Sequence, residues 1–115
     1  SSMILGKHSI IDIYDCKCNI DDISLIKDIL ITSAREAHLH VVDLVFHKFD
    51  PVGISGVLVL AESHIAIHTW PEHNFVSVDA FTCGTKMDPS NVLLLIKDKL
   101  KSTNYKLNSF NRGEF

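Results

Sequence analysis

The chain lacks a long apolar run and an excess of basic charge, and each absence excludes a class of protein. No hydrophobic stretch approaches the ~18 to 20 residues that a membrane-spanning helix needs. No segment has the charged start and small-residue cleavage site of a secretory signal, so we expect a cytoplasmic protein. The formal net charge is −3, and the lysines are scattered along the chain. A nucleic-acid partner is therefore disfavoured, because such proteins usually present a basic face.

Cysteine is sparse as well. Cys16, Cys18 and Cys83 are an odd number of thiols, and the Cys-x-Cys spacing differs from the Cys-x-x-Cys of redox and zinc motifs. The sequence therefore does not predict a disulfide framework. Histidine, in contrast, is frequent: the chain has 7, and most of them lie between His40 and His73.

The length of 115 residues and a hydrophobic fraction of 46% are typical of one globular domain, which we expect to span residues 1–115. Apolar residues spaced by three and four predict a helix over residues 22–38, with Asn19 or Asp21 as its cap. A second helix is predicted from Asp88, as N-cap, with Pro89 at the first helical position, to about residue 101.

Six segments have the composition of β-strands, at about residues 8–14, 40–49, 56–62, 65–70, 74–83 and 105–111. Their order relative to the helices predicts an α+β fold, a two-layer α/β sandwich with an antiparallel sheet and both helices on one face. Residues 56–61 are apolar at both odd and even positions, so both faces of that strand should be covered. A second copy packing sheet against sheet would cover the other face, giving an αββα homodimer.

The dipeptide Glu62-Ser63 is the most informative chemical feature. A serine ends an apolar strand, follows an acid, and precedes His64 and His68. Three kinds of site could use these residues. A metal site could draw on His64, His68, Glu72, His73 and Cys83, but His64 and His68 would be ~13 Å apart on a strand, so no metal is expected.

A hydrolase could use Ser63 or Cys83 as a nucleophile activated by His68. The Gly-x-Ser-x-Gly elbow of such enzymes is absent around Ser63. The third possibility is self-cleavage, in which the Ser63 hydroxyl attacks the Glu62 carbonyl and turns the amide into an ester. A base then removes the Ser63 α-proton, Glu62 leaves as a carboxylate, and the dehydroalanine hydrolyses to a pyruvoyl group. Ser55 and His68 are the local candidates for the hydrogen-bond donor and the proton carrier.

Several separated blocks, in order, resemble the prokaryotic S-adenosylmethionine decarboxylase family over nearly the whole chain. The blocks are Gly6-x-His8, Phe46-His47-Lys48-Phe49-x-Pro51-x-Gly53-x-Ser55-Gly56, Glu62-Ser63-His64-x-x-x-His68-Thr69-Trp70-Pro71-Glu72, Asp79-x-Phe81-Thr82-Cys83-Gly84, Asp88-Pro89 and Arg112-Gly113. The resemblance implies that the chain is a pyruvoyl-dependent proenzyme whose cofactor forms from Ser63. Cleavage would leave a β chain of residues 1–62 and an α chain of residues 63–115.

The resemblance also implies roles for individual residues. Ser55 and His68 match positions that assist cleavage, with His68 as the proton acceptor, and Cys83 matches the proton donor of decarboxylation. Phe49, Ile65 and Glu72 are expected to bind substrate, with Phe49 stacking on the adenosyl group and Glu72 contacting the ribose hydroxyls. The sites of such small family members lie at the interface of a homodimer.

The implied reaction begins when the pyruvoyl ketone condenses with the α-amine of S-adenosylmethionine to a Schiff base, which acts as an electron sink. Loss of CO₂ and protonation by Cys83 would give decarboxylated S-adenosylmethionine, the aminopropyl donor for spermidine synthesis. Two alternatives remain open from the sequence. The same cofactor could decarboxylate ornithine or arginine, or the chain could be an inactive homologue that serves as a partner subunit.

Overall fold

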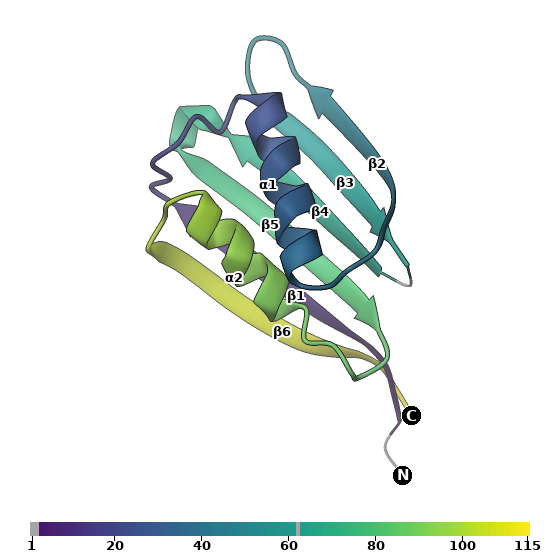
Figure 1. The fold of residues 1–115 in the computed structure, drawn as a ribbon. Helices are drawn as coiled ribbons and strands as arrows, with labels where there is room; N and C mark the ends of the chain where they lie inside the picture. The colour runs from purple at the N-terminus through teal and green to yellow at the C-terminus, as the bar shows by residue number, and fades with distance from the viewer. Residues whose placement is uncertain (1–2, 62) are drawn as a thin grey trace.

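A computed structural model describes residues 3–61 and 63–115 (Figure 1). The elements are β1 (Ile4–Tyr14), α1 (Ile23–Glu36), β2 (Val41–Lys48), β3 (Ile54–Leu60), β4 (Ser63–Trp70), the short 3₁₀ helix η1 (Pro71–His73), β5 (Phe75–Cys83), α2 (Ser90–Lys99) and β6 (Asn104–Glu114). The strands form one antiparallel sheet in the order β2-β3-β4-β5-β1-β6. Both helices cover the same face of this sheet (Figure 1), so the predicted α+β fold in two layers is confirmed.

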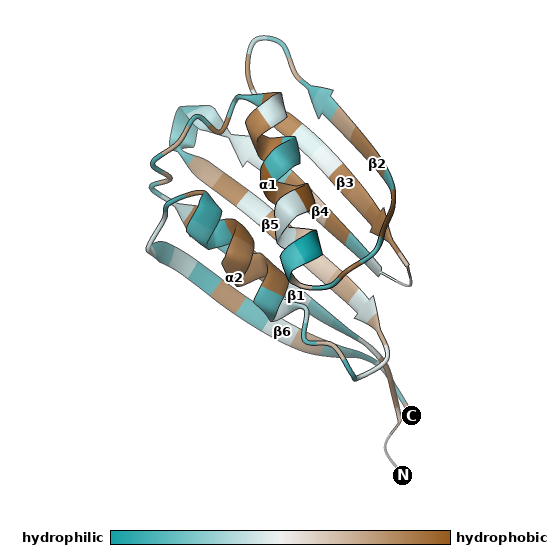
Figure 2. Cartoon of the chain, viewed as in Figure 1, coloured by the Kyte–Doolittle hydropathy of each residue, from teal (hydrophilic) through white to brown (hydrophobic). Residues whose placement is uncertain are grey.

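The core lies between the helices and the sheet. Alternate residues of the central strands point into it, including Leu58 on β3, Ile67 on β4 and Val78 on β5, all of which are buried. Ile26 and Leu30 of α1 and Leu93 of α2 meet them from the helix side. Figure 2 shows hydrophobic residues on both helices and on the strands beneath them. Within the described residues, neither helix is long and apolar enough to cross a membrane.

No helix of residues 3–61 and 63–115 covers the opposite face of the sheet, which we call the open face. It exposes large apolar side chains from four strands: Val45, Val57, Val59, Trp70 and Ile10. Val57 and Val59 alternate along β3 with the buried Leu58 and Leu60. A single chain therefore covers only one face of β3, although the apolar sequence of this strand predicts that both faces are covered.

The structure corrects several local predictions. The cap of α1 is Asp22, not Asn19 or Asp21, because its carboxylate accepts the backbone N–H groups of Ser24 and Leu25. Helix α2 begins at Ser90, one residue after Pro89, while the Asp88 carboxylate still accepts the Ser90 N–H at 3.0 Å.

Strands β1, β4 and β6 are longer than predicted, β3 begins and ends two residues earlier, and β2 and β5 are shorter by one or two residues. β1 and β6 extend to Ile4 and Glu114 because these ends pair with each other, a contact between chain ends that local composition does not indicate. β4 begins at Ser63 and not at Ile65. Ser63 therefore belongs to a strand in the middle of the sheet, paired with Leu60 on β3 and Thr82 on β5.

Candidate active site

The residues predicted to carry chemistry fall into two groups at opposite ends of β4. Ser63 begins the strand, and it follows the turn that joins β3 to β4. Its Oγ donates a hydrogen bond back across this turn to the Ala61 carbonyl, at 3.2 Å. The strand alternates, with Ile65 and Ile67 buried against the helices, so Ser63 shares their face of the sheet. Glu62, the other half of the predicted cleavage site, lies outside the described residues.

Ser63 and Cys83 line the same pocket, a hollow of about 590 Å³ at this end of the sheet. Cys83 is the last residue of β5 and is exposed. The rest of the wall comes from the α1–β2 connection and from the loop after β5: His38, Leu39, His40, Gly84, Thr85, Lys86 and Met87, together with Ala61 and Thr82. The sequence indicated Ser63 and Cys83 but not His38, His40 or Lys86, because no spacing pattern relates them to Ser63.

The second group lies near the other end of β4, around Ser55 and His68. The two residues are directly opposite each other in the β3–β4 register, and Ser55 Oγ lies 2.8 Å from His68 Nδ1. A hollow beside them is also lined by Phe49, Trp70 and Glu72. The structure thus collects the predicted cleavage-assisting pair and two of the predicted substrate-binding residues at one place.

The two groups do not meet within one chain. Ser63 and His68 are five residues apart on a strand, about 16 Å at ~3.3 Å per residue. The odd number of steps also places their side chains on opposite faces of the sheet. His68 of a given chain therefore cannot act on Ser63 of the same chain in this conformation.

The predicted substrate-binding residues differ in their access to ligand. Phe49 is 46% exposed, and its ring forms a T-shaped pair with the ring of His47, with the centroids 4.6 Å apart. Glu72 is exposed on η1. Ile65 is fully buried in the core, which leaves only its backbone for contact with a bound molecule.

The loop that carries Phe49 is held from the helix side by Asp21 and Lys48. Asp21 Oδ1 accepts the Gly53 N–H at 2.8 Å, and Asp21 Oδ2 lies 3.2 Å from Lys48 Nζ. Lys48 Nζ also donates to the carbonyl of Phe49 at 2.7 Å. The hydrogen bond from Gly53, followed by the interaction with Lys48, lowers the pKa of the Asp21 carboxyl. The carboxylate form of Asp21 is therefore the one that the folded loop stabilises.

The three thiols are in different environments. Burial raises the pKa of Cys16 to about 11, with further increases from Cys18 and Asp15. Burial also raises the pKa of Cys18. Cys83 is the exposed thiol and the one that shares a pocket with Ser63.

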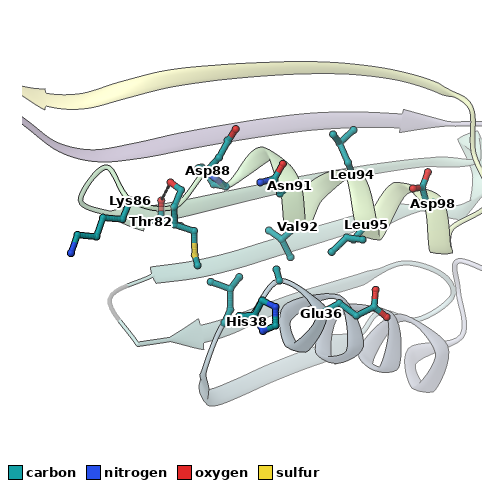
Figure 3. Close-up of a pocket in the computed structure, with 14 residues that line it drawn as sticks. Glu36, His38, Thr82, Lys86, Asp88, Asn91, Val92, Leu94, Leu95 and Asp98 are labelled. Carbon is teal, nitrogen blue, oxygen red and sulfur yellow. Dashed lines mark hydrogen bonds between the residues drawn. The ribbon is translucent and has the colours of Figure 1, made fainter.

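Figure 3 shows a separate groove in the helix layer, lined by residues of α2 such as Asn91, Leu94 and Asp98, and by Glu36 at the end of α1. None of the predicted site residues that the structure describes lines this groove. It borders the Ser63 pocket through the shared residues His38, Thr82 and Lys86.

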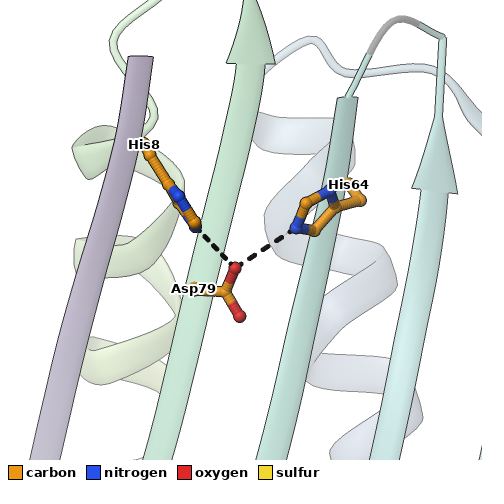
Figure 4. A group of neighbouring side chains, drawn as sticks. All are labelled: His8, His64 and Asp79. Carbon is orange, nitrogen blue, oxygen red and sulfur yellow. Dashed lines mark hydrogen bonds and ion pairs between the residues drawn. The ribbon is translucent and has the colours of Figure 1, made fainter. Parts of the chain in front are cut away.

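A cluster of two histidines and an acid lies on the open face, beside the start of β4 (Figure 4). His8 Nε2 and His64 Nε2 lie 2.8 and 3.2 Å from the same oxygen, Oδ2 of Asp79. These three atoms could in principle hold a metal ion. However, Arg112 donates a hydrogen bond to His8 Nδ1 at 2.8 Å.

Arginine can only donate, so His8 Nδ1 must be the acceptor and Nε2 must carry the proton of the neutral ring. That proton occupies the position that a metal would need. The arrangement is therefore a hydrogen-bonded network. It is a different set of residues from the metal site considered from the sequence, with which it shares only His64.

Comparison with known proteins identifies related sequences and a related structure. A family model described as S-adenosylmethionine decarboxylase matches residues 7–113. A protein of Pseudomonas paraeruginosa named S-adenosylmethionine decarboxylase proenzyme is 42% identical over 111 residues, which cover 96% of this chain and 69% of the relative. A protein of the same name from Thermoanaerobacter sp. is 43% identical over 112 residues, covering 96% of this chain and 90% of the relative. The crystal structure of the adenosylmethionine decarboxylase of Aquifex aeolicus superposes with a TM-score of 0.87 at 32% identity, covering 96% of this chain and 92% of that one.

Proposed function

The chain belongs to the S-adenosylmethionine decarboxylase family, and we propose that it converts S-adenosylmethionine to decarboxylated S-adenosylmethionine and CO₂ for spermidine synthesis. The observation that carries the proposal is the pocket shared by Ser63 and Cys83, a hydroxyl that can become the cofactor beside a thiol that can donate a proton. The names of the matched relatives favour this substrate over ornithine or arginine. They also disfavour the reading as an inactive partner subunit.

The proposed cofactor is a pyruvoyl group formed from Ser63 by cleavage of the Glu62–Ser63 bond, leaving residues 1–62 and 63–115. The word proenzyme in the names of the relatives supports this maturation. The described residues fit such a group, because Ser63 begins a strand directly after a tight turn, half-buried beside an open pocket. When present, a pyruvoyl group supplies a carbonyl that accepts the electron pair left by departing CO₂.

Cys83 is the proposed proton donor to the substrate α-carbon after CO₂ leaves. General acid catalysis requires the acid to lie within hydrogen-bond reach of the atom it protonates, and Cys83 lines the same pocket as Ser63. The other two cysteines are unsuited to this role. Cys16 is in the core, and Cys18 Sγ is directed at the Leu100 carbonyl.

Ser55 and His68 are the proposed assistants of cleavage, and they would act on Ser63 of a second copy. Their hydroxyl–imidazole contact of 2.8 Å provides a hydrogen-bond donor and a proton acceptor, the two functions that the ester and elimination steps need. Since one chain holds the pair about 16 Å from its own Ser63, the site requires a partner.

The open face is the proposed dimer interface. Two sheets packed face to face would bury Val45, Val57 and Val59 and complete an αββα sandwich. A two-fold axis that lies between the two sheets and crosses the strands would bring the start of one β4 near the end of the other, because it reverses the strand direction and uses the same patch on both copies. Each dimer would then contain two complete sites.

The substrate-binding part of the proposal uses the hollow beside His68. Phe49 and Trp70 offer aromatic faces that can stack on adenine and attract the sulfonium charge. Glu72 offers a carboxylate that can accept hydrogen bonds from the ribose hydroxyls. Ile65 would contribute through its backbone only, since its side chain is buried.

Intact mass spectrometry combined with a CO₂-release assay tests the proposal. We expect the purified chain to split after Glu62 and to leave a fragment from position 63 with a blocked amino terminus. The cleaved protein should release CO₂ from S-adenosylmethionine but not from ornithine or arginine, and the matched Ser63→Ala variant should remain whole and inactive. A parent chain that stays whole would contradict the maturation, and CO₂ release from the basic amino acids alone would contradict the substrate.

A further inference from the structure

Self-cleavage would create a chain end in the middle of the sheet. β4 lies between β3 and β5, and its first residue is Ser63. After the cut, position 63 would no longer be tied through the turn to β3, and only hydrogen bonds would hold it. Ends of strands open more easily than their centres, yet the group at position 63 must keep its place beside Cys83.

The side chain next to this new end is fastened across the open face. His64 donates from Nε2 to Asp79 on β5 at 3.2 Å, and its ring stacks on Phe81 with the planes 7° apart. The sheet register explains the contact, because Phe81 is opposite both His64 on β4 and His8 on β1, and Asp79 is two residues away on the same face. Figure 4 shows both rings pointing to the one Asp79 oxygen.

The network continues along the open face to Arg112 on the edge strand β6. His8 donates to Asp79 at 2.8 Å and accepts from Arg112 at the same distance, and the Arg112 guanidinium also lies 6.0 Å from the centre of the Phe81 ring. Asp79 thus accepts hydrogen bonds from both rings, and Arg112 compensates its charge through His8. Charge-assisted hydrogen bonds of this kind are stronger than neutral ones.

We infer that His64, Asp79, His8 and Arg112 form an anchor that holds the start of β4 in register once the bond before Ser63 is cut. The inference rests on the proposed function. These four are positioning residues, since Asp79, His8 and Arg112 act on position 63 only through His64. In the uncleaved chain the covalent turn performs the same task, so the anchor matters most after cleavage.

The test compares anchor variants in two backgrounds, the self-cleaving chain and the uncleavable Ser63→Ala chain. Asp79→Ala and Arg112→Ala each remove one link, and Asp12→Ala and Lys106→Ala are matched controls, since these two residues pair across β1 and β6 on the same open face. We expect the anchor variants to lower the Tm of the cleaved protein by at least about 5 °C more than that of the Ser63→Ala protein, at one protein concentration. Hydrogen exchange of the first β4 amides should rise about tenfold in the cleaved form alone.

Kinetics provide a second readout. In the cleaved anchor variants kcat should fall several-fold while KM changes little, because the displaced group is at the Ser63 end and the adenosyl hollow is at the other. Equal losses of Tm in both backgrounds would overturn the anchor and assign the network to general stability. If both anchor variants fail to cleave although their Ser63→Ala counterparts are folded, the network serves the cleavage step and the anchor is likewise overturned. A parent chain that never cleaves instead overturns the proposed function itself.

Discussion

Burial separates the three thiols, which have the same chemistry in an unfolded chain. Cys16 is 5% exposed, and its pKa is raised to about 11 by burial. Cys83 lies exposed at the end of β5, beside Ser63. A single residue type therefore contributes an inert core side chain at one position and a candidate acid at another.

Alkylation should reveal this difference. We expect iodoacetamide at pH 8 to modify Cys83 well before Cys16, because only the thiolate reacts and a pKa of about 11 leaves about 0.1% of Cys16 in that form. Peptide mass spectrometry over time would measure the two rates, and loss of decarboxylation should follow the modification of Cys83. A Cys18→Ser variant with unchanged kinetics would serve as the control. Equal rates at Cys16 and Cys83 would contradict the burial argument.

Gly56 illustrates a residue required for its lack of a side chain. A Cβ at this position would collide with the ring of Phe46 on the neighbouring strand, since the two residues are directly opposite. We expect Gly56→Ala to destabilise the fold by about 1–3 kcal/mol, the usual cost of overpacking. Urea unfolding in the Ser63→Ala background would measure it, and the cost should shrink when Phe46→Leu is added. The same cost with Leu at 46 would show that the clash is not the cause.

At the scale of elements, the connection between β2 and β3 is held by contacts from outside the sheet. The Phe49 N–H donates to the Gly53 carbonyl at 2.8 Å, closing the loop, and Asp21 and Lys48 tie it to the segment before α1. This loop forms one wall of the hollow that contains Ser55 and His68. The segment before α1 thus helps to position Phe49, a proposed substrate-binding residue.

Removing the charge of Asp21 should loosen this wall. We expect Asp21→Asn to raise KM for S-adenosylmethionine several-fold with little change in kcat or in the rate of self-cleavage, because Phe49 shifts while Ser63 and Cys83 do not. Steady-state kinetics and intact mass would separate these effects. Asp28→Asn, at an exposed position of α1, is the matched control. A fall in kcat with unchanged KM would contradict the assignment.

The same variant should change how stability depends on pH. The folded pKa of Asp21 is lowered, so the carboxylate stabilises the fold at pH values above the pKa of an unfolded aspartate, about 3.9. This contribution is lost as the pH falls through the folded pKa. The difference in Tm between the parent and Asp21→Asn should therefore be constant near neutral pH and shrink in acid. A Tm difference that grows in acid would contradict a lowered pKa of Asp21 in the folded state.

At the scale of the whole molecule, the open face and the separation of the two groups of site residues point to the same assembly. The open face exposes valines on β2 and β3 and polar groups on β4 and β5. In the described chain, the helices cover the other side of β3 and leave this side uncovered. Pairing of two such faces would bury the valines and bring the start of each β4, where the bond before Ser63 lies, toward a partner's His68.

Mixing two inactive variants tests the shared site. We expect Ser63→Ala and His68→Asn to be inactive alone, and to regain about 25% of the parental activity when co-expressed. Random pairing makes half of the dimers mixed, and each mixed dimer has one intact site. Intact mass should show cleavage of the His68→Asn chain only in the mixture. No recovery would indicate that Ser63 and His68 of one chain act together after a rearrangement.

A charge on the open face should prevent assembly. We expect Val57→Asp to give a monomer by sedimentation velocity and to reduce self-cleavage more than tenfold, because a buried unpaired carboxylate opposes association. Asn91→Asp adds the same charge at an exposed position of α2 and should leave both properties unchanged. A dimeric and fully active Val57→Asp protein would exclude this face as the interface.

The sequence by itself determined the element order, the helix faces and the identity of the chemical groups, because hydrophobic period and turn residues are local properties. The sequence blocks identify Ser63, Cys83, Ser55 and His68 as candidate site residues. They do not give the distances between these residues. The helix cap at Asp22 and the long ends of β1 and β6 also needed the fold, since both depend on backbone geometry that composition leaves open.

Only the tertiary structure decided which residues meet. His8, His64, Asp79 and Arg112 occur in four separate blocks of the sequence, and the register of β1, β4, β5 and β6 places them within hydrogen-bond reach. The same register holds Ser63 and His68 apart, although they are close in sequence, because strand residues five positions apart face opposite sides at a distance of about 16 Å. The spacing of residues along a chain determines which face of a helix or strand they share. Contacts between strands depend instead on pairing between segments that are far apart in the sequence.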